Sequence, residues 1–511
     1  MYKIRNKNNI FDELYLSFLE CSKNKSSTIN AVNFIIDKER KLISLRQDLE
    51  TKKYKPGKSI YFMVTKPKIR EVFAADFRDR IIHHFFIRAI EKQFYNDLTS
   101  SPYSCIKGKG THLCINNIKK VVGNYKYYLQ IDIKSFFMSI DKEILKNKVR
   151  SYLPQNIEKH INSNLLNNYN LNIYNYLLDI IIDFNPITDC VYKGNKDLIK
   201  LLPEEKSLFN LVKGKGLAIG NYSSQFFANI YLNDLDKYIL NLGIKDYFRY
   251  VDDLLILGND FKKLKELEKL INTYLKDNLL MQLAKGKTKL KQINHGLDFL
   301  GYFIKKDVTY VRKRVIHNFI GKINIMKEKS ISYINIISLQ KLQKINIKTK
   351  NIIKVINFEK EILNNIVQVF SSYVGHFSHA NAKHLLKKIL YKNSFLQYYF
   401  DFEGKKHKYL KYKKFKTLNK AYNYYDKLYK NTIIFYPHNN YYVFKKKYVF
   451  LLKKINKKYY NKIIIYKNIG FKIHKDYYKI ILLEFLRIKK YNILLINKNI
   501  SKYSLEKLFI I

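Results

Sequence analysis

Hydrophobic positions along the chain follow two spacings, which together predict a fold of mixed helices and strands. Repeats every three or four residues indicate helices, and short runs rich in β-branched and aromatic residues indicate strands. Helices are expected over residues 1–55, 79–94, 224–240 and 261–279. Strands are expected at 59–64, 71–74, 127–133, 247–250 and 254–257, with a strand pair around 297–304. Residues 185–213 look irregular, and residues 306–395 look helical and basic. The pattern therefore predicts an α+β unit that ends near residue 305, followed by a helical segment.

The composition changes near residue 400, where lysine and tyrosine become very frequent. Strand-like runs at 432–436, 462–466 and 492–496, with a helical stretch at 475–487, predict a small additional α/β unit. Lysine runs interleaved with tyrosines suit single-stranded nucleic acid, through backbone contacts and base stacking. An ordinary folded module with a lysine-rich surface explains the same composition equally well.

Charge and composition indicate a folded protein with a polyanionic partner. Lysine and arginine total 95 and aspartate and glutamate 42 in 511 residues, which gives a formal net charge of +53. Because 47% of residues are hydrophobic and only 7 are proline, the chain is not a disordered basic tail. The abundance of Lys, Asn, Ile and Tyr indicates an A+T-rich coding sequence, so we use the sign of the charge rather than its size.

The chain has no sequence feature of a membrane or secreted protein. No apolar run approaches the roughly 18 residues that a span requires, and the first twenty residues carry acids, unlike a signal peptide. A cytoplasmic location is expected. The four cysteines lack metal or redox spacing, which predicts reduced thiols.

Arginine is rare in this chain, and its planar fork suits phosphate better than lysine does. Its positions therefore mark candidate phosphate contacts. They gather at Arg70, Arg78, Arg80 and Arg88, and then at Arg249, Arg312 and Arg314.

Three acids stand out at the ends of apolar strands. Asp132 follows Leu129 and Ile131, and Asp252 and Asp253 lie where two short apolar strands meet. If the fold brings them together, three carboxylates would keep their protons unless divalent cations bind. Two Mg²⁺ ions, with Mn²⁺ as a possible substitute, about 3.5–4 Å apart could activate a hydroxyl and stabilise a departing phosphate in nucleotidyl transfer. A lone Asp-Asp pair is more often ordinary turn composition, but the apolar flanks and Asp132 favour a metal site.

Four motifs in a fixed order resemble the reverse transcriptase family. Tyr250-Val-Asp-Asp253 resembles the YxDD box, and Asp132-Ile-Lys-Ser-Phe-Phe137 resembles the first catalytic box. Between them, Gly216-Leu-Ala-Ile-Gly220 and the helix that follows look like the loop–helix box that frames nucleotide and template. Leu297-Asp-Phe-Leu-Gly301-Tyr resembles the primer-gripping hairpin. The ordered set covers residues 60–305.

The resemblance implies a right-hand polymerase fold with fingers, palm and helical thumb, plus a small C-terminal α/β domain. Under it, residues 1–120 hold the N-terminal helices and fingers. The palm spans 121–305, with a fingers-like insertion at about 150–215. The thumb is expected at 306–397, and the Lys/Tyr-rich C-terminal domain at 398–511.

The resemblance also implies roles for single residues. Asp132, Asp252 and Asp253 would be the catalytic metal ligands, and Lys287 the acid that protonates the leaving pyrophosphate, unless it is simply a solvated lysine. Phe137 would exclude a ribose 2′-hydroxyl, so that the product is DNA. The residues expected to bind the nucleotide are Lys68, Arg70, Phe137, Gly220 and Gln225. Those expected to contact nucleic acid are Arg78, Arg80, Lys109, Tyr250, Gly301, Arg312 and Arg314. His83 and His84 lack acid or cysteine partners at ligand spacing and are expected to pack within a helix.

The finer motif pattern narrows the branch of the family. The pairs Ile219-Gly220 and Ser224-Gln225 are typical of diversity-generating retroelement polymerases and of defence-associated bacterial reverse transcriptases. The expected function is an RNA-directed DNA polymerase that makes cDNA from a cognate noncoding RNA and dNTPs in antiphage defence. The alternative is the mutagenic reverse transcriptase of a diversity-generating retroelement, and a catalytically inactive RNA-binding scaffold is least favoured. A homo-oligomer is compatible with the sequence.

Overall fold

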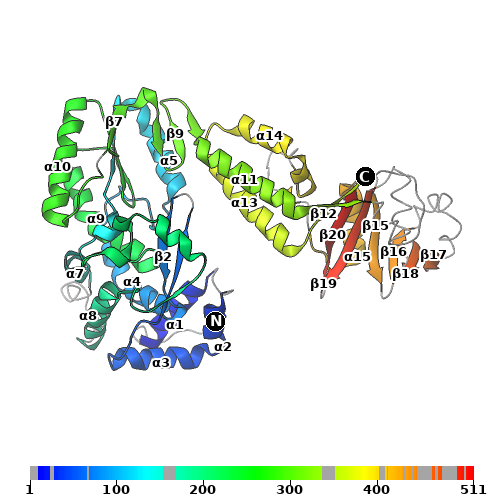
Figure 1. Ribbon diagram of the computed structural model, residues 1–511, viewed down its shortest axis with the longest axis horizontal. Helices are drawn as coiled ribbons and strands as arrows, with labels where there is room; N and C mark the ends of the chain where they lie inside the picture. The colour runs from blue at the N-terminus through cyan, green and yellow to red at the C-terminus, as the bar shows by residue number, and fades with distance from the viewer. Residues whose placement is uncertain are drawn as a thin grey trace. The chain divides into compact units, whose positions relative to one another are not determined.

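The computed structural model divides the chain into two compact units, Met1–Leu300 with Ile304–Asp307, and Gly301–Phe303 with Val308–Ile511 (Figure 1). The structure describes residues 10–23, 28–65, 68–153, 168–284, 286–335 and 352–401. Shorter described stretches are 409–410, 413–429, 432–438, 441–445, 463–466, 470–474, 492–499 and 502–510. No helix in these ranges is both long and apolar enough to cross a membrane.

The first unit begins with three helices, α1 (Ile10–Ser22), α2 (Ile29–Ile36) and α3 (Lys38–Glu50). They pack around α4 (Phe77–Asp97), the helix expected at 79–94. Leu14, Phe18 and Phe34 join Phe77 of α4 in one buried core. The three N-terminal helices and α4 therefore share one hydrophobic core.

A small sheet of three strands follows, in the order β2-β1-β4. β1 (Ser59–Val64) and β2 (Arg70–Ala74) form an antiparallel hairpin, and β4 (Cys190–Tyr192) runs parallel to β1. The segment expected to be irregular thus contributes a strand, followed by the short helices η3 (Lys196–Leu201), η4 (Glu204–Lys206) and η5 (Leu208–Asn210). Buried Glu71 of β2 anchors this segment, because it accepts hydrogen bonds from the Ser207 hydroxyl and the Leu208 amide.

The central sheet of the first unit is antiparallel and has the order β5-β6-β3-β7. Its strands are β5 (Tyr247–Tyr250), β6 (Asp253–Gly258), β3 (Tyr127–Asp132) and β7 (Lys289–Gln292). Cross-strand partners share a face of a sheet. Leu129 pairs with Ile256, and Ile131 with Leu254, which places these four side chains on one apolar face.

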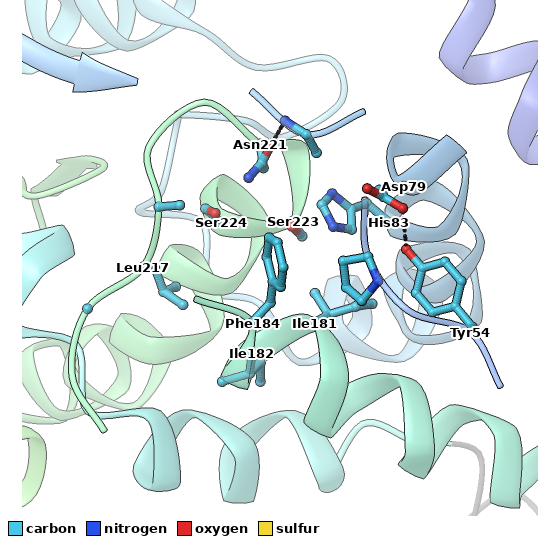
Figure 2. Close-up of a pocket in the computed structure, with 14 residues that line it drawn as sticks. Tyr54, Asp79, His83, Ile181, Ile182, Phe184, Leu217, Asn221, Ser223 and Ser224 are labelled. Atoms are coloured by element: carbon cyan, nitrogen blue, oxygen red, sulfur yellow. Dashed lines mark hydrogen bonds between the residues drawn. The ribbon is translucent and has the colours of Figure 1, made fainter. Parts of the chain in front are cut away.

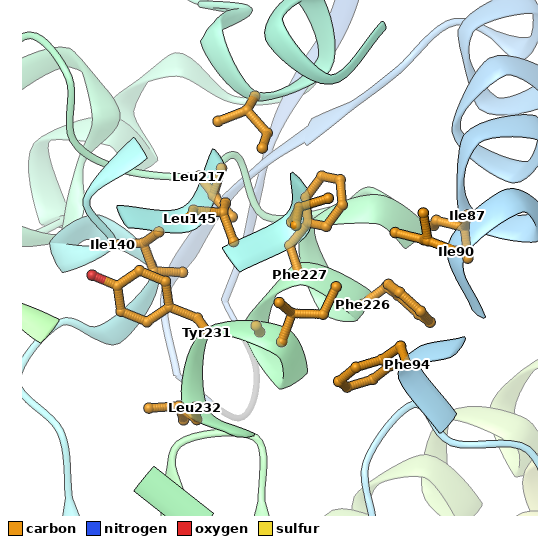
Figure 3. Packing of buried hydrophobic residues seen from close by; sticks show 14 of the residues in the cluster. Ile87, Ile90, Phe94, Ile140, Leu145, Leu217, Phe226, Phe227, Tyr231 and Leu232 are labelled. Atoms are coloured by element: carbon orange, nitrogen blue, oxygen red, sulfur yellow. The ribbon is translucent and has the colours of Figure 1, made fainter. Parts of the chain in front are cut away.

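Two long helices bury that apolar face, namely α9 (Tyr222–Asn241) and α10 (Phe261–Leu279). Phe226 of α9 also packs on Phe94 of α4, whereas Tyr231 of α9 lies beside Ile140 (Figure 3). The remaining elements of this unit are shorter. They are α5 (Thr111–Val121), η1 (Val122–Asn124), α6 (Phe136–Ser139), α7 (Lys142–Arg150), α8 (Asn168–Asp183), η6 (Ile293–His295) and β8 (Leu297–Phe299).

The second unit includes the first two residues of β9 (Tyr302–Ile304), and continues with β10 (Thr309–Val311) and the helix α11 (Lys313–Ser330). α11 packs against α13 (Lys360–Ser378), which is followed by α14 (Lys383–Lys392) and η7 (Ser394–Tyr398). The expectation of helix throughout 306–395 is wrong in the middle. Ile- and Val-rich β11 (Ile331–Asn335) and β12 (Ile352–Asn357) form an antiparallel pair there, because β-branched side chains favour strands.

The strands of that pair belong to an eight-stranded sheet with the order β11-β12-β20-β19-β15-β16-β18-β17. The strands expected at 432–436, 462–466 and 492–496 are confirmed as β15 (Thr432–His438), β17 (Ile463–Tyr466) and β19 (Asn492–Asn499). The other elements are β13 (Phe400–Asp401), β14 (Tyr409–Leu410), α15 (Leu418–Leu428), β16 (Tyr441–Lys445), β18 (Gly470–His474) and β20 (Lys502–Ile510). The helix expected at 475–487 lies outside the described residues.

Candidate active site

The register of the central sheet brings the three singled-out aspartates together. Asp132, the last residue of β3, lies directly opposite Asp253, the first residue of β6. Asp253 also pairs with Tyr250 of β5, so that Val251 and Asp252 form a two-residue turn between β5 and β6. Asp132, Asp253 and Tyr250 therefore share the face of the sheet opposite the helices, and Asp252 lies at its edge.

The turn itself is conformationally unusual. Val251 has φ +59°, in the left-handed region that β-branched residues strongly avoid. Holding a residue in such a region costs on the order of 1–3 kcal/mol and requires support from its surroundings. The chain thus maintains strain at the residue immediately before Asp252.

Two of the three aspartates, Asp252 and Asp253, have a raised pKa. Burial, and then the charges of Asp252 and Asp132, raise the pKa of Asp253 to about 6. The pKa of Asp252 is also raised, by burial and then by Asp132. Lys68 and Arg70 act in the opposite direction on both groups. The hairpin of β1 and β2 therefore brings two cations within electrostatic range of the carboxylates.

Lys287 lies closer to the site than these two residues. Its Nζ atom is 3.5 Å from Oδ2 of Asp132, and 52% of its side chain is exposed. Its segment is held beside β3, because the Ala284 amide donates to the Asp132 carbonyl and the Lys287 amide donates to the Ala284 carbonyl. The side chain expected to donate a proton thus lies beside a predicted metal ligand.

The donor set suits a hard divalent cation. Carboxylates whose pKa is raised by burial and neighbouring negative charge, as for Asp252 and Asp253, are stabilised when a cation neutralises them, and oxygen ligands are those that Mg²⁺ prefers. Within the described ranges, no three His, Cys, Asp or Glu side chains stand in an arrangement that could already hold a metal. Asp132, Asp252 and Asp253 thus supply the oxygen ligands and the negative charge that such an ion requires, but not the geometry of a formed metal site.

A glycine-containing loop lies against β2 near this site. Gly220 has φ +124°, and a Cβ atom there would lie 2.6 Å from Cγ1 of Val72 and 3.1 Å from the Phe73 carbonyl. Only glycine fits this conformation and this close approach. The Phe73 amide donates to the Ile219 carbonyl, and the Leu217 amide donates to the Phe137 carbonyl. The loop at 216–220 is therefore held against β2, and Phe137 is attached to it through its backbone carbonyl.

Gln225 and Tyr250 each have a partner from the segment that leads into α5. The Cys105 thiol donates to the exposed Gln225 side chain, with 3.1 Å between Sγ and Oε1. The Thr111 hydroxyl donates to the Tyr250 hydroxyl over 3.0 Å. The segment at 105–111 thus contacts both Gln225, a predicted nucleotide-binding residue, and Tyr250 at the end of β5.

A small cavity lies behind the loop, between α4, α8 and the start of α9 (Figure 2). His83 lines it, and burial, then His84 and Arg80, lower the pKa of His83 to about 3. Its Nδ1 atom has no hydrogen-bond partner among the described residues. Nearby, the Tyr54 hydroxyl donates to Asp79 and the Ala75 amide donates to the Asn221 side chain. His83 therefore packs as a neutral residue within the core, whereas His84 stacks on Tyr222.

Several predicted nucleic-acid contacts bind other parts of the protein. Arg78 pairs with Asp48 and donates to the Lys55 carbonyl. Arg80 donates to the Ala75 carbonyl, and Lys109 donates to the carbonyls of Ser100 and Pro102. Gly301, Arg312 and Arg314 lie in the second unit, where the Arg312 amide donates to the Gly301 carbonyl and Arg314 is exposed. Contacts of these residues with nucleic acid remain predictions.

Arg249 departs from the expectation of a phosphate contact. Its side chain is 0% exposed and is bound to Asp236 of α9, so it cannot reach a phosphate in solution. Sequence reasoning did not identify Asp236 or its neighbour Asn229. A signal was present, since Asn229, Asn233 and Asp236 recur at helical spacing on an otherwise apolar buried face of α9.

Comparison with known families agrees with this geometry. Residues 55–304 match the family described as reverse transcriptase (RNA-dependent DNA polymerase), which implies the polymerase palm fold for the first unit. The protein is an RNA-directed DNA polymerase, a nucleotidyltransferase. Enzymes of this class act on an RNA template and dNTPs, make cDNA and generally use divalent metal ions. A search of curated protein sequences gave no match.

Proposed function

We propose that this polymerase copies a cognate noncoding RNA into cDNA, with Asp132, Asp252 and Asp253 holding two Mg²⁺ ions. The observation that carries the proposal is the β3–β6 register, in which Asp132 lies opposite Asp253 beside the turn that contains Asp252. The bound ions would supply Lewis acidity for attack of a primer hydroxyl on the nucleotide's α-phosphate. The raised pKa of Asp253 supports a site that is completed by external positive charge.

The other predicted residues fit roles around this centre. Lys68 and Arg70 are exposed and act electrostatically on the carboxylates, as cations that bind an incoming triphosphate would. The Lys287 side chain lies beside Asp132, in a position suited to a general acid for the leaving pyrophosphate. Phe137 is partly buried, packs on Phe136 and is tied to the nucleotide loop, which supports a steric role toward the sugar.

We propose antiphage defence as the biological role. The Ile219-Gly220 and Ser224-Gln225 pairs occur in both defence-associated and diversity-generating enzymes. The second unit adds a large mixed sheet beyond the polymerase match at 55–304, which favours a defence enzyme over the compact diversity-generating type.

The proposal is tested by sequencing the RNA and DNA that co-purify with the wild type and with an Asp252→Ala, Asp253→Ala variant, expressed from the native locus with and without phage. We expect one local RNA in both samples and complementary DNA only with the wild type. Systematic misincorporation opposite template adenines would assign the enzyme to the diversity-generating class instead. Equal RNA binding without any DNA that depends on the two acids would leave an RNA-binding scaffold.

A further inference from the structure

A buried ion pair lies directly beneath the turn that carries Asp252 and Asp253. Nε of Arg249 donates to both carboxylate oxygens of Asp236 over 2.8 and 3.0 Å, and Nη2 donates to Oδ2 over 2.6 Å. Both side chains are 0% exposed. The Tyr247 hydroxyl donates to the same carboxylate over 2.7 Å. The carboxylate is thereby fully enclosed by donors.

The remaining donors of the guanidinium group reach the turn. Nη1 of Arg249 donates to the Val251 carbonyl over 3.1 Å and to the Asn229 side chain over 3.0 Å. Asn229 in turn donates to the Ser104 carbonyl. One planar group thus connects α9, β5 and the turn in a fixed geometry that a lysine could not reproduce.

The backbone of Arg249 is fixed on the outer edge of β5 as well. Its amide donates to the Ser101 carbonyl and its carbonyl accepts from the Tyr103 amide, both over 2.9 Å. Arg249 is therefore immobilised by its side chain and by its backbone, and its contact with Val251 is made from a rigid base.

Stability alone does not account for this pair. Removing two charges from water costs several kcal/mol per ion, and apolar residues of similar volume are often equally or more stabilising. The contact with Val251 indicates a different role, because that residue occupies a left-handed conformation that it strongly disfavours. A carbonyl held by a rigid donor cannot rotate away to relieve the strain.

We propose that Arg249 and Asp236 are positioning residues of the polymerase, which hold Val251 left-handed so that Asp252 and Asp253 are presented beside Asp132. This inference rests on the proposed metal-binding role of those aspartates. Neither Arg249 nor Asp236 touches the substrate, since both side chains are fully buried where α9 covers the sheet.

The test compares Arg249→Lys with and without Val251→Gly in primer extension on an RNA template, with thermal unfolding of each protein. Lysine keeps the charge beside Asp236 but loses the fork to Val251. We expect kcat to fall on the order of 100-fold, as for a small misplacement of reacting groups, with the KM for dNTP changed only a few-fold. Glycine adopts positive φ freely, so adding Val251→Gly to Arg249→Lys should raise kcat about tenfold above that of Arg249→Lys alone.

Arg88→Lys is the matched control. Arg88 departs from the expectation of a phosphate contact, because its guanidinium group forms ion pairs with Glu13 and Glu20 of α1, away from the turn. This variant should lower the melting temperature without lowering kcat, and Val251→Gly should give it no gain. If Arg249→Lys does not fold, Tyr247→Phe is used in its place, because it removes the hydroxyl that donates to Asp236. Its kcat should fall less, and Val251→Gly should again recover part of the loss.

Two outcomes would overturn the proposal. One is a kcat loss in Arg249→Lys no greater than that in Arg88→Lys, and the other is a loss that Val251→Gly does not recover. An inactive wild type, or an Asp252→Ala variant as active as the wild type, would instead reject the proposed function of the aspartates. The failures of the two proposals are therefore distinguishable.

Discussion

Two groups of charged side chains lie on opposite faces of the central sheet, and the fold treats them differently. On the helix-covered face, Arg249 and Asp236 are buried and neutralise each other through hydrogen bonds in fixed directions. On the other face, Asp132 and Asp253 lie opposite each other with Asp252 at the edge, and the pKa of Asp253 is raised to about 6.

The difference separates a structural use of charge from a catalytic one. A buried ion pair whose hydrogen bonds are all formed requires no ligand from solution, whereas carboxylates that repel one another are stabilised by a bound cation. Cross-strand partners set this contrast, since Arg249 lies opposite Leu254 on one face and Tyr250 lies opposite Asp253 on the other.

The largest effect is expected from Asp252→Ala. Activity should fall roughly 10⁴-fold or more, because the variant removes a ligand whose contribution is made at the reacting centre. Without metal, its free energy of unfolding at neutral pH should be equal to or greater than that of the wild type, since a disfavoured carboxylate has gone. Steady-state dNTP incorporation and urea unfolding check the two parts. A variant that unfolds much more easily would show that the aspartates are structural.

Arg249→Met, unlike Asp252→Ala, should lower the free energy of unfolding. It leaves Asp236 buried without its partner, which costs about 3–5 kcal/mol of the free energy of unfolding. The double variant Arg249→Met, Asp236→Leu should regain most of that loss, because no charge then remains buried. Urea unfolding of the three proteins measures it. Equal stability of the single and double variants would contradict a buried ion pair.

His83 provides a third case, a buried base that the fold keeps neutral. Its pKa is lowered to about 3, mainly by burial, against about 6.5 in the unfolded chain. Between these values the unfolded chain binds a proton that the folded protein does not, so the stability that His83 contributes is complete above about pH 6.5 and declines as the pH falls. At about pH 5 the loss should approach about 2 kcal/mol.

The measurement is the change in unfolding free energy between about pH 7 and about pH 5, compared between the wild type and His83→Gln. The comparison is needed because burial raises the pKa of Asp79, in the same cavity, which changes stability with pH in the opposite sense. The same pH dependence in both proteins would contradict a neutral buried His83.

Local patterns predicted much of the fold of the first unit. The spans expected for β1, β5 and α10 agree with the structure residue for residue. α10 begins where Asp260 caps the amides of Lys262 and Lys263, which fixes its start by a purely local interaction. Elements defined by long-range pairing were missed. β4 has only three residues and depends on β1, and β11 depends on β12 across residues 336–351.

The candidate site shows the same division between local and long-range information. Asp132, Asp252 and Asp253 could be singled out because each stands at the end of an apolar strand. Arg249 was singled out as a rare arginine, but a phosphate was expected as its partner. Its partner is instead the carboxylate of Asp236 on α9, thirteen residues earlier, which tertiary packing brings to it. A rare arginine in sequence therefore indicates a specific planar contact, without indicating whether the partner is a phosphate or a carboxylate.

The smallest effect on the free energy of unfolding is expected from Lys287→Met, in contrast with Arg249→Met. Lys287 is also paired with an aspartate, at 3.5 Å, but 52% of its side chain is exposed. Solvent-exposed pairs contribute less than about 1 kcal/mol, so urea unfolding should change by no more than that, and Lys287→Arg should change it even less. Saturating Mg²⁺ should abolish the difference between wild type and variant, because the cation then neutralises Asp132 in place of the lysine. A loss of several kcal/mol that persists with Mg²⁺ would place Lys287 in the same structural category as Arg249, and the two faces of the sheet would no longer differ in how they use charge.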